Sequence, residues 1–368
     1  MITEKLKFHV LSYDQKSVRI LFPFKSLFLL ANQKGMKYLF LFLMWIQILC
    51  GQSAPEELGK VSWLRDADIA KSESAKTNKP ILILFQEIPG CSTCKNYGRN
   101  ILSHPMVVEA IEQNFIPLAI YNNKSGKDHE VLQFFNEPAW NNPVVRIVDS
   151  KLNDICERLS GNYSSFGLIS KINASFVKRG KVVPEYLRLL EEEFYAESGG
   201  TEKAYVGMYC FWSGEKCFAQ APGVVSTRSG YMKGSEVVEV QYNPKLTNLD
   251  AILRHGKEMH CADRLYHETP SPNYTNSVQV LNKGDFTVDK ELKYYIFQSF
   301  YRFIPMTDMQ AMKVNLALGS NKSPEEFLCP AQLKMVKEIK NNPGKKYKNK
   351  IGMPVEDAWP MMLRELKS

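Results

Sequence analysis

Several features that would assign this sequence to a class at once are missing. Its 368 residues contain no internal repeat and no low-complexity tract. The apolar run from Tyr38 to Leu49 is only about 12 residues long, which is shorter than a transmembrane helix usually requires. A single C-x-x-C occurs, so the second ligand pair that a cysteine-rich zinc site needs is absent. We therefore expect neither a metal nor an organic cofactor.

The composition is that of an ordinary globular chain, with 44% hydrophobic and 23% charged residues. The length suggests two or three domains. The net charge of +8 is mild and comes largely from the first 40 residues and the Lys-rich stretch 334–350. Such a charge run is usually a solvated face, so no nucleic-acid partner is expected.

Residues 1–53 read as a signal-peptide region whose true start is Met36, with the mature chain beginning at Ala54. An uncleaved anchor is the alternative. A lipoprotein acylated at Cys50 is disfavoured because Leu49 is large for the preceding position. We expect export to the periplasm or the extracellular space, with membrane contact only through this segment.

Export implies an oxidising compartment, where cysteines pair or do redox work. If Cys50 leaves with the signal peptide, seven of the eight cysteines remain, and at least one is free or transiently paired. The seven are Cys91, Cys94, Cys156, Cys210, Cys217, Cys261 and Cys329.

The C-x-x-C of Cys91 and Cys94 follows the apolar run 81–85, which predicts a strand buried on both faces. A C-x-x-C between such a strand and a helix is the thioredoxin arrangement. It places the first cysteine at the helix N-terminus and the second one turn inward, close enough for a disulfide. A purely structural disulfide is the alternative.

Residues 54–196 resemble a thioredoxin-like domain. The Ile-Pro-Gly-Cys-Ser-Thr-Cys loop ending at Cys94 is similar to that of thioredoxin-like (seleno)proteins with a Val-Pro-Gly-Sec/Cys motif. This resemblance implies that Cys91 is the attacking residue and that Pro143 is a cis-proline beside it. The polar, Gly-rich residues 197–201 then form the domain boundary.

Cys210 follows the segment 207–209, which begins with a glycine and is expected to form a turn, and it precedes the aromatic pair Phe211 and Trp212. A helix is expected soon after it, and the positive end of a helix dipole favours a thiolate. The aromatic pair would form an apolar wall beside the sulfur. A buried cysteine in an aromatic core is the alternative.

Three segments in order resemble peptide methionine sulfoxide reductase A: the Cys-Phe-Trp run with Tyr209 in place of Gly, residues 222–231, and residues 235–244. The expected fold class is therefore α/β, a thioredoxin-like fold followed by an α+β reductase-like domain over 202–320. Residues 321–368 would form a basic C-terminal extension.

The resemblance implies that Cys210 attacks the sulfoxide sulfur while Glu236, as a neutral acid in an apolar site, donates a proton. Phe211 and Trp212 would hold the substrate methyl group. The products are methionine and a sulfenic acid on Cys210, which a second thiol must resolve. A strand-end surface carboxylate is the alternative for Glu236.

The resolving thiol is left open. Cys217 would lie about 10.5 Å from Cys210 along a helix, whereas a disulfide needs Cα atoms within roughly 7 Å. We therefore expect Cys217 to be a core thiol. Cys261, Cys329 and Cys91 are the other candidates.

The chain also departs from the reductase pattern. The loop before Glu236 is too short to contain the family's Asn-Pro-x-Tyr segment. The family's Gly-Asn-Asp-x-Gly-x-Gln-Tyr-Arg run is only weakly similar to residues 260–266. Asp263 and Tyr266 are the candidates to stand in as substrate-binding residues. Farther on, residues 293–296 are expected to form a strand.

Three functions are compatible with these observations. The first is an exported methionine sulfoxide reductase that acts on oxidised methionine in proteins or peptides, with a fused thioredoxin-type thiol donor. The second is a thiol–disulfide oxidoreductase or thiol peroxidase acting through Cys91 and Cys94. The third is a redox-sensing or binding protein without catalysis.

Overall fold

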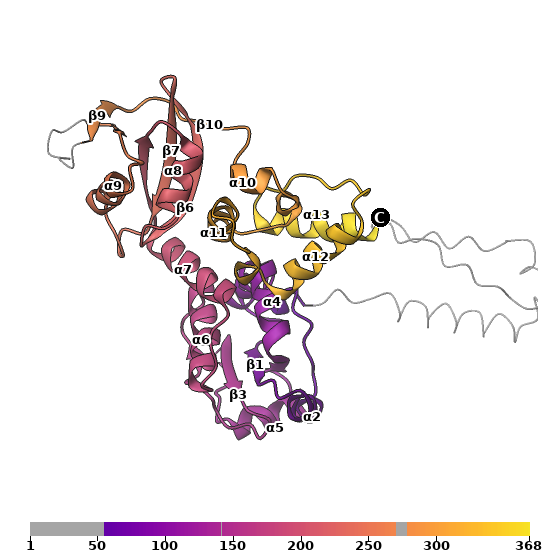
Figure 1. Ribbon diagram of the computed structural model, residues 1–368. Helices are drawn as coiled ribbons and strands as arrows, with labels where there is room; N and C mark the ends of the chain where they lie inside the picture. The colour runs from indigo at the N-terminus through magenta and orange to yellow at the C-terminus, as the bar shows by residue number, and fades with distance from the viewer. Residues whose placement is uncertain (1–54, 141, 270–277) are drawn as a thin grey trace, which may run out of the picture. The chain divides into compact units, whose positions relative to one another are not determined.

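The computed structural model describes residues 55–140, 142–269 and 278–368. Figure 1 shows the arrangement of their helices and strands. The expected signal-peptide region, residues 1–53, lies outside the described residues. Within the described ranges, no helix combines the length and the apolar character that crossing a bilayer requires.

The first sheet has four strands in the order β2-β1-β3-β4. β1 runs parallel to β2 and antiparallel to β3, and β3 is antiparallel to β4. Their bounds are β1 Ile81–Gln86, β2 Ile116–Tyr121, β3 Val144–Val148 and β4 Leu159–Ser160.

Strand β1 is buried on both faces, as its apolar run predicts. Ile83 and Phe85 point to one side of the sheet, and Leu82 and Leu84 to the other, and none of the four is exposed. The first side packs against α2 and α5, and the second against α4, α6 and α7. This part of the chain therefore has three layers, with helices on both faces of the sheet.

The helices of this part begin at polar caps: Asp66, His104 and Ser164 accept backbone N–H groups at the starts of α2, α4 and α6. The bounds are α2 Ala67–Thr77, α3 Ser92–Asn96, α4 Pro105–Asn114, α5 Lys127–Phe134, α6 Ser165–Lys178 and α7 Glu185–Gly199. Short η1 (Glu56–Leu58) and η2 (Tyr97–Ile101) flank α3 in space.

The second sheet has six strands in the order β10-β6-β7-β5-β8-β9. Neighbouring strands are antiparallel except for the parallel pair β8 and β9. The bounds are β5 Glu202–Gly207, β6 Val224–Met232, β7 Ser235–Tyr242, β8 Arg264–His267, β9 Gln279–Asn282 and β10 Thr287–Val288.

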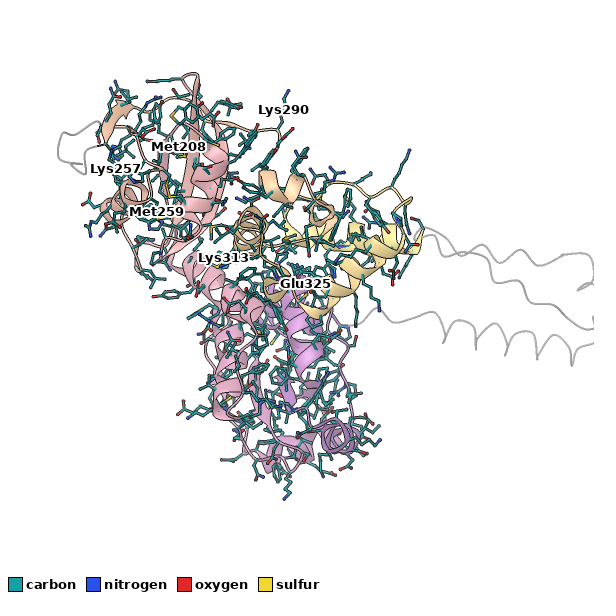
Figure 2. All side chains as sticks on the ribbon, in the orientation of Figure 1. Met208, Lys257, Met259, Lys290, Lys313 and Glu325 are labelled. Carbon is teal, nitrogen blue, oxygen red and sulfur yellow. A yellow bond between two sulfur atoms is a disulfide. The ribbon has the colours of Figure 1, made fainter. Side chains whose placement is uncertain are left out.

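One face of this sheet carries α8 (Phe211–Phe218), α9 (Leu249–Glu258) and α11 (Asp308–Gly319). Met208, labelled in Figure 2, belongs to the apolar core between the sheet and α8. Its sulfur occupies the place where a Cβ on Gly214 would be. Glycine at 214 therefore lets α8 sit close to the sheet.

The C-terminal residues form a third apolar core around Ile296, Val314 and Met362. Residues 293–296 do not form the expected strand, because Tyr294–Phe297 is the short helix α10. The remaining elements are η3 Phe300–Phe303, η4 Glu325–Phe327, α12 Pro330–Asn341 and α13 Val355–Lys367.

A buried carboxyl on α7 caps the start of α11. The Oε1 atom of the Glu193 carboxyl group accepts the backbone N–H of Met309 at 3.2 Å, and the N-cap of the helix is Thr307. Burial raises the pKa of Glu193 to about 8. The folded state therefore favours the protonated acid.

We expect Glu193→Gln to flatten the pH dependence of stability. The neutral acid's contribution is complete below the unfolded pKa of about 4.5 and is lost as pH rises towards about 8. The wild-type free energy of unfolding should fall across this window relative to the variant, by at most about 1.4 kcal/mol per pH unit. Urea titrations at several pH values test this. Glu192→Gln, at the exposed neighbouring position, should keep the wild-type slope.

Candidate active sites

The first candidate site is the C-x-x-C at the end of β1. Cys91 is the N-cap of α3 and is exposed, whereas Cys94 is fully buried. Their sulfur atoms are 3.7 Å apart, and both thiols are free. The structure thus brings the two cysteines together in the arrangement that the spacing predicts.

The two thiols differ in acidity. Hydrogen bonding from the backbone N–H of Cys94 lowers the pKa of Cys91. Burial raises the pKa of Cys94 to about 11. At neutral pH a larger fraction of Cys91 is therefore thiolate, whereas Cys94 stays protonated.

Asn142 and Pro143 lie directly behind this pair. The Asn142–Pro143 peptide bond is cis, which is the isomer expected for Pro143. The Oδ1 atom of Asn142 accepts the Cys94 thiol at 2.7 Å and the backbone N–H of Glu87 at 3.2 Å. Ile88–Pro89 is also cis, which the sequence did not indicate.

We expect iodoacetamide to alkylate Cys91 well before Cys94 in the reduced chain. Cys91 should react at a lower pH than an ordinary thiol because its thiolate is stabilised and exposed. Mass spectrometry of peptides after timed labelling measures both rates. Equal rates at the two positions would contradict the assigned roles, and the buried Cys156 supplies an unreactive internal reference.

The second candidate site surrounds Cys210. This half-buried residue is the N-cap of α8. Glu236 lies on β7, and its carboxylate accepts the backbone N–H of Phe211 at 2.8 Å. The backbone carbonyl of Glu236 also accepts the N–H of Met208 at 3.2 Å. These two bonds, one on each side of Cys210 in the chain, place the carboxylate beside the thiol.

Aromatic rings line the neighbourhood of this thiol. Phe211 is buried and packs edge-on against Tyr231, with ring centroids 5.3 Å apart. Trp212 stacks on Tyr294 at 3.9 Å with an interplanar angle of 17°. Tyr209, which stands where the resembling family has glycine, is 94% exposed and so does not fill the site.

Two tyrosines that sequence reasoning missed bring hydroxyl groups to this site. Desolvation, helped by the charges of Asp289 and Glu236, raises the pKa of Tyr231. Desolvation, helped by the charge of Cys210, raises the pKa of Tyr295. Both hydroxyls therefore stay protonated and can donate hydrogen bonds. The sequence predicted a strand over 293–296, so it did not single out Tyr295, which the structure places on the short helix α10 near Cys210.

A buried ion pair holds α10 against α8. The Lys293 ammonium donates to Glu215 at 2.8 Å and also to the hydroxyl and carbonyl oxygens of Thr227 on β6. Lys293 is 4% exposed and Glu215 only 1%. Because Lys293 directly precedes Tyr294, this pair sets where the α10 tyrosines lie relative to Trp212.

We expect Lys293→Met to destabilise the chain by about 3–5 kcal/mol, because it leaves the Glu215 carboxylate buried without its partner. The double variant Lys293→Met/Glu215→Met should recover most of that loss. Denaturant unfolding measures both. Lys290→Met removes an exposed lysine three residues earlier and should be nearly neutral. A single variant as stable as wild type would show that the pair is dispensable.

The two candidate substrate-binding residues, Asp263 and Tyr266, differ in how close they lie to the Cys210 site. Asp263 lies near it, since its backbone N–H donates to the carbonyl of Gly207 at 3.0 Å and its side chain is exposed. Tyr266 does not. Its strand partner is Tyr205, it packs against Val237 and is 3% exposed. Strand alternation places it on the face opposite Glu236.

The structure excludes two of the three candidate resolving thiols, Cys261 and Cys329. Cys217 and Cys261 form a disulfide with Cα atoms 6.6 Å apart, so Cys217 is not a core thiol and Cys261 is not free. The sequence could not show this pairing because the two are 44 residues apart. Cys329 is fully buried, and burial raises its pKa strongly. Cys91 is left as the exposed candidate among the described cysteines.

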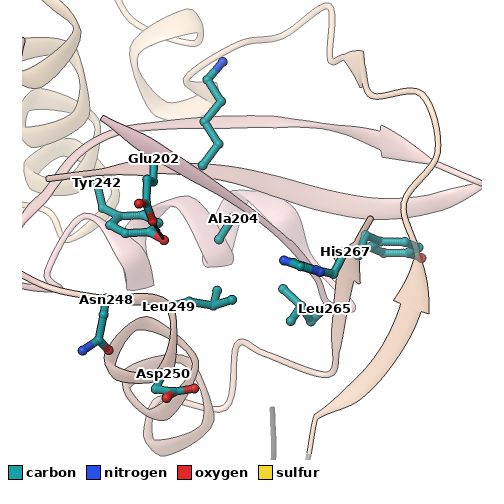
Figure 3. A pocket seen from close by; sticks show the side chains of 10 residues that line it. Glu202, Ala204, Tyr242, Asn248, Leu249, Asp250, Leu265 and His267 are labelled. Atoms are coloured by element: carbon teal, nitrogen blue, oxygen red, sulfur yellow. Dashed lines mark hydrogen bonds between the residues drawn. The ribbon is translucent and has the colours of Figure 1, made fainter. Parts of the chain in front are cut away.

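A hollow of about 530 Å³ lies between α9 and the second sheet (Figure 3). Glu202, Asp250 and His267 face it, and the hydroxyl of Tyr242 donates to Glu202 at 2.7 Å. The β5 residues that line the hollow are Glu202, Lys203 and Ala204, whereas Cys210 follows the end of that strand, and neither Cys210 nor Glu236 lines it. It does not form part of the Cys210 site.

Comparison with known proteins agrees with the two-part fold. Residues 62–150 match the family model described as thioredoxin-like, and residues 202–248 match that of peptide methionine sulfoxide reductase. The matched segments contain the two thiol sites described above. The chain therefore has a thioredoxin-like domain followed by a domain of the peptide methionine sulfoxide reductase type.

Curated relatives bear the same name as the second model. A peptide methionine sulfoxide reductase MsrA of Geobacter sulfurreducens is 35% identical over 91 residues, which are 20% of this chain and 56% of that protein. The MsrA of Methanococcus maripaludis strain C7 is 29% identical over 157 residues, 38% of this chain and 82% of that protein. The chain thus spans little more than half the length of the first relative.

The likeness of the Cys91 loop to the Val-Pro-Gly-Sec/Cys group stays a prediction.

Proposed function

We propose that this chain reduces methionine sulfoxide in peptides or proteins at Cys210 and that Cys91 and Cys94 return Cys210 to its thiol. The observation that carries the proposal is the Glu236 carboxylate bound to the N–H of Phe211 beside the half-buried Cys210. This pairing lies inside the segment matched to peptide methionine sulfoxide reductase.

The chemistry follows from the positions of these groups. Cys210 attacks the sulfoxide sulfur as a thiolate, and the carboxyl group of Glu236 delivers the proton that the sulfoxide oxygen takes up. Methionine leaves with the sulfur reduced, and Cys210 keeps the oxygen as a sulfenic acid. Tyr231 and Tyr295 supply hydroxyl donors near the oxygen, and Trp212 with its stacked Tyr294 bounds the space for the methyl group.

Recycling needs two thiols. The Cys91 thiolate attacks the Cys210 sulfenic sulfur and releases water, which forms a mixed disulfide. Cys94 then attacks Cys91, frees Cys210 and leaves a Cys91–Cys94 disulfide, which an external thiol donor must reduce. The exposed outer sulfur and the inner one 3.7 Å behind it fit this order.

We also propose export to an oxidising compartment. The buried Cys217–Cys261 disulfide supports it, because such bonds persist where thiols are not kept reduced. A signal segment within residues 1–53 would supply the route.

A second function deserves its own test. The Cys91/Cys94 pair has the exposure and acidity of a thiol–disulfide oxidoreductase by itself. In that case the pair would act on protein disulfides and the second domain would not act on methionine sulfoxide.

Turnover of a methionine sulfoxide peptide with dithiothreitol, followed by mass spectrometry, separates the two proposals. We expect Cys210→Ser to abolish product, Glu236→Gln to lower kcat by about 10²–10⁴-fold through loss of the proton donor, and Cys91→Ser to keep turnover because dithiothreitol bypasses the recycling pair. Glu258→Gln, an exposed carboxyl on α9, is the matched control.

The opposite result is equally specific. No turnover in wild type, together with insulin disulfide reduction that requires Cys91, would reject sulfoxide reduction and support the second function.

A further inference from the structure

A third ligand-bearing side chain lies at the Cys91/Cys94 pair. A carboxylate oxygen of Glu87 and the two sulfur atoms all lie within 4.8 Å of one another. We propose that the chain in its dithiol form binds one zinc ion through Glu87, Cys91 and Cys94. This site is separate from Cys210 and does not depend on sulfoxide reduction.

The spacing of the sulfur atoms fits this metal. A tetrahedral zinc ion with two Zn–S bonds of about 2.3 Å holds its sulfur atoms about 3.8 Å apart. The two sulfur atoms of the reduced pair are 3.7 Å apart. An ion could therefore enter between them with little movement of either cysteine.

The third ligand comes from the same loop, four residues before Cys91. Glu87 follows β1 directly and is half-buried, and its backbone N–H donates to the Asn142 oxygen that also accepts the Cys94 thiol. One amide thus ties the backbone of Glu87 to the sulfur of Cys94. The single C-x-x-C argued against a metal because a second cysteine pair is absent, but the fold supplies a carboxylate in its place.

Three protein ligands leave a fourth position open. Cys91 is exposed, so water can reach this position from solvent, and an open site of this kind exchanges its ligand. Binding requires both sulfur atoms as thiolates and releases their protons. A Cys91–Cys94 disulfide removes both sulfur ligands, so the ion should bind only the reduced chain.

The test uses the full chain, reduced with a phosphine, freed of reductant without oxygen and titrated with Zn²⁺ against a chromophoric chelator. Co²⁺ is a second probe, because thiolate ligands give it a charge-transfer absorption band. We expect one ion per chain, loss of the band in Cys91→Ser and Cys94→Ser, and affinity at least about 10-fold weaker in Glu87→Gln.

Matched controls keep the other groups constant. Glu130→Gln changes an exposed carboxyl on α5, and Cys210→Ser removes the thiol of the second site. Both should bind as wild type does. Circular dichroism of each variant shows whether the fold persists.

A measurement on the unmodified chain does not depend on any variant folding. Zn²⁺ should slow alkylation of Cys91 by iodoacetamide and leave Cys210 unaffected. Absence of a thiolate band in wild type, unchanged affinity in a folded Glu87→Gln, or no protection of Cys91 would each overturn the proposal. Because no sulfoxide turnover is measured, failure here is distinct from failure of the proposed function.

Discussion

The Cys210 site depends on the buried contact between Lys293 and Glu215. Three elements meet at this ammonium group: α8 through Glu215, β6 through Thr227, and the start of α10 through Lys293 itself. A charge pair so far from water is stable only while its partners hold their positions. The helix that bears the nucleophile and the helix that bears two tyrosines are therefore fixed to each other.

The two reactive thiols, Cys91 and Cys210, both stand at the start of a helix, but their neighbouring side chains differ. Cys91 and Cys210 each cap the start of a helix and reach solvent. Behind Cys91 lies a second thiol, which suits it to disulfide exchange. Beside Cys210 lies the carboxyl group of Glu236, which suits it to a reaction that consumes a proton. This division of chemistry matches the proposed function, in which the Cys91/Cys94 pair recycles Cys210.

Burial and pairing remove the other described cysteines from this exchange. Cys217 is bound to Cys261, and Cys156 and Cys329 are buried with raised pKa values. Among the described residues, the Cys91/Cys94 pair is then left as the candidate to reduce an oxidised Cys210 under the proposed function. The disulfide also joins α8 to the segment after α9, so it stabilises the helix that carries Cys210.

The local features of both sites could be predicted from the amino-acid sequence. The five apolar residues before the Cys91 loop specified a doubly buried strand, and the order of three short segments around Cys210 specified the reductase-type domain, because both signals are contiguous in the chain. The positions of Cys91, Cys94, Cys210 and Glu236 followed from them. The long-range contacts could not be predicted, because they join residues far apart in sequence. Only the tertiary structure paired Cys217 with Cys261, placed Tyr266 on the face of the sheet opposite Glu236, joined Lys293 to Glu215, and brought Tyr295 near Cys210.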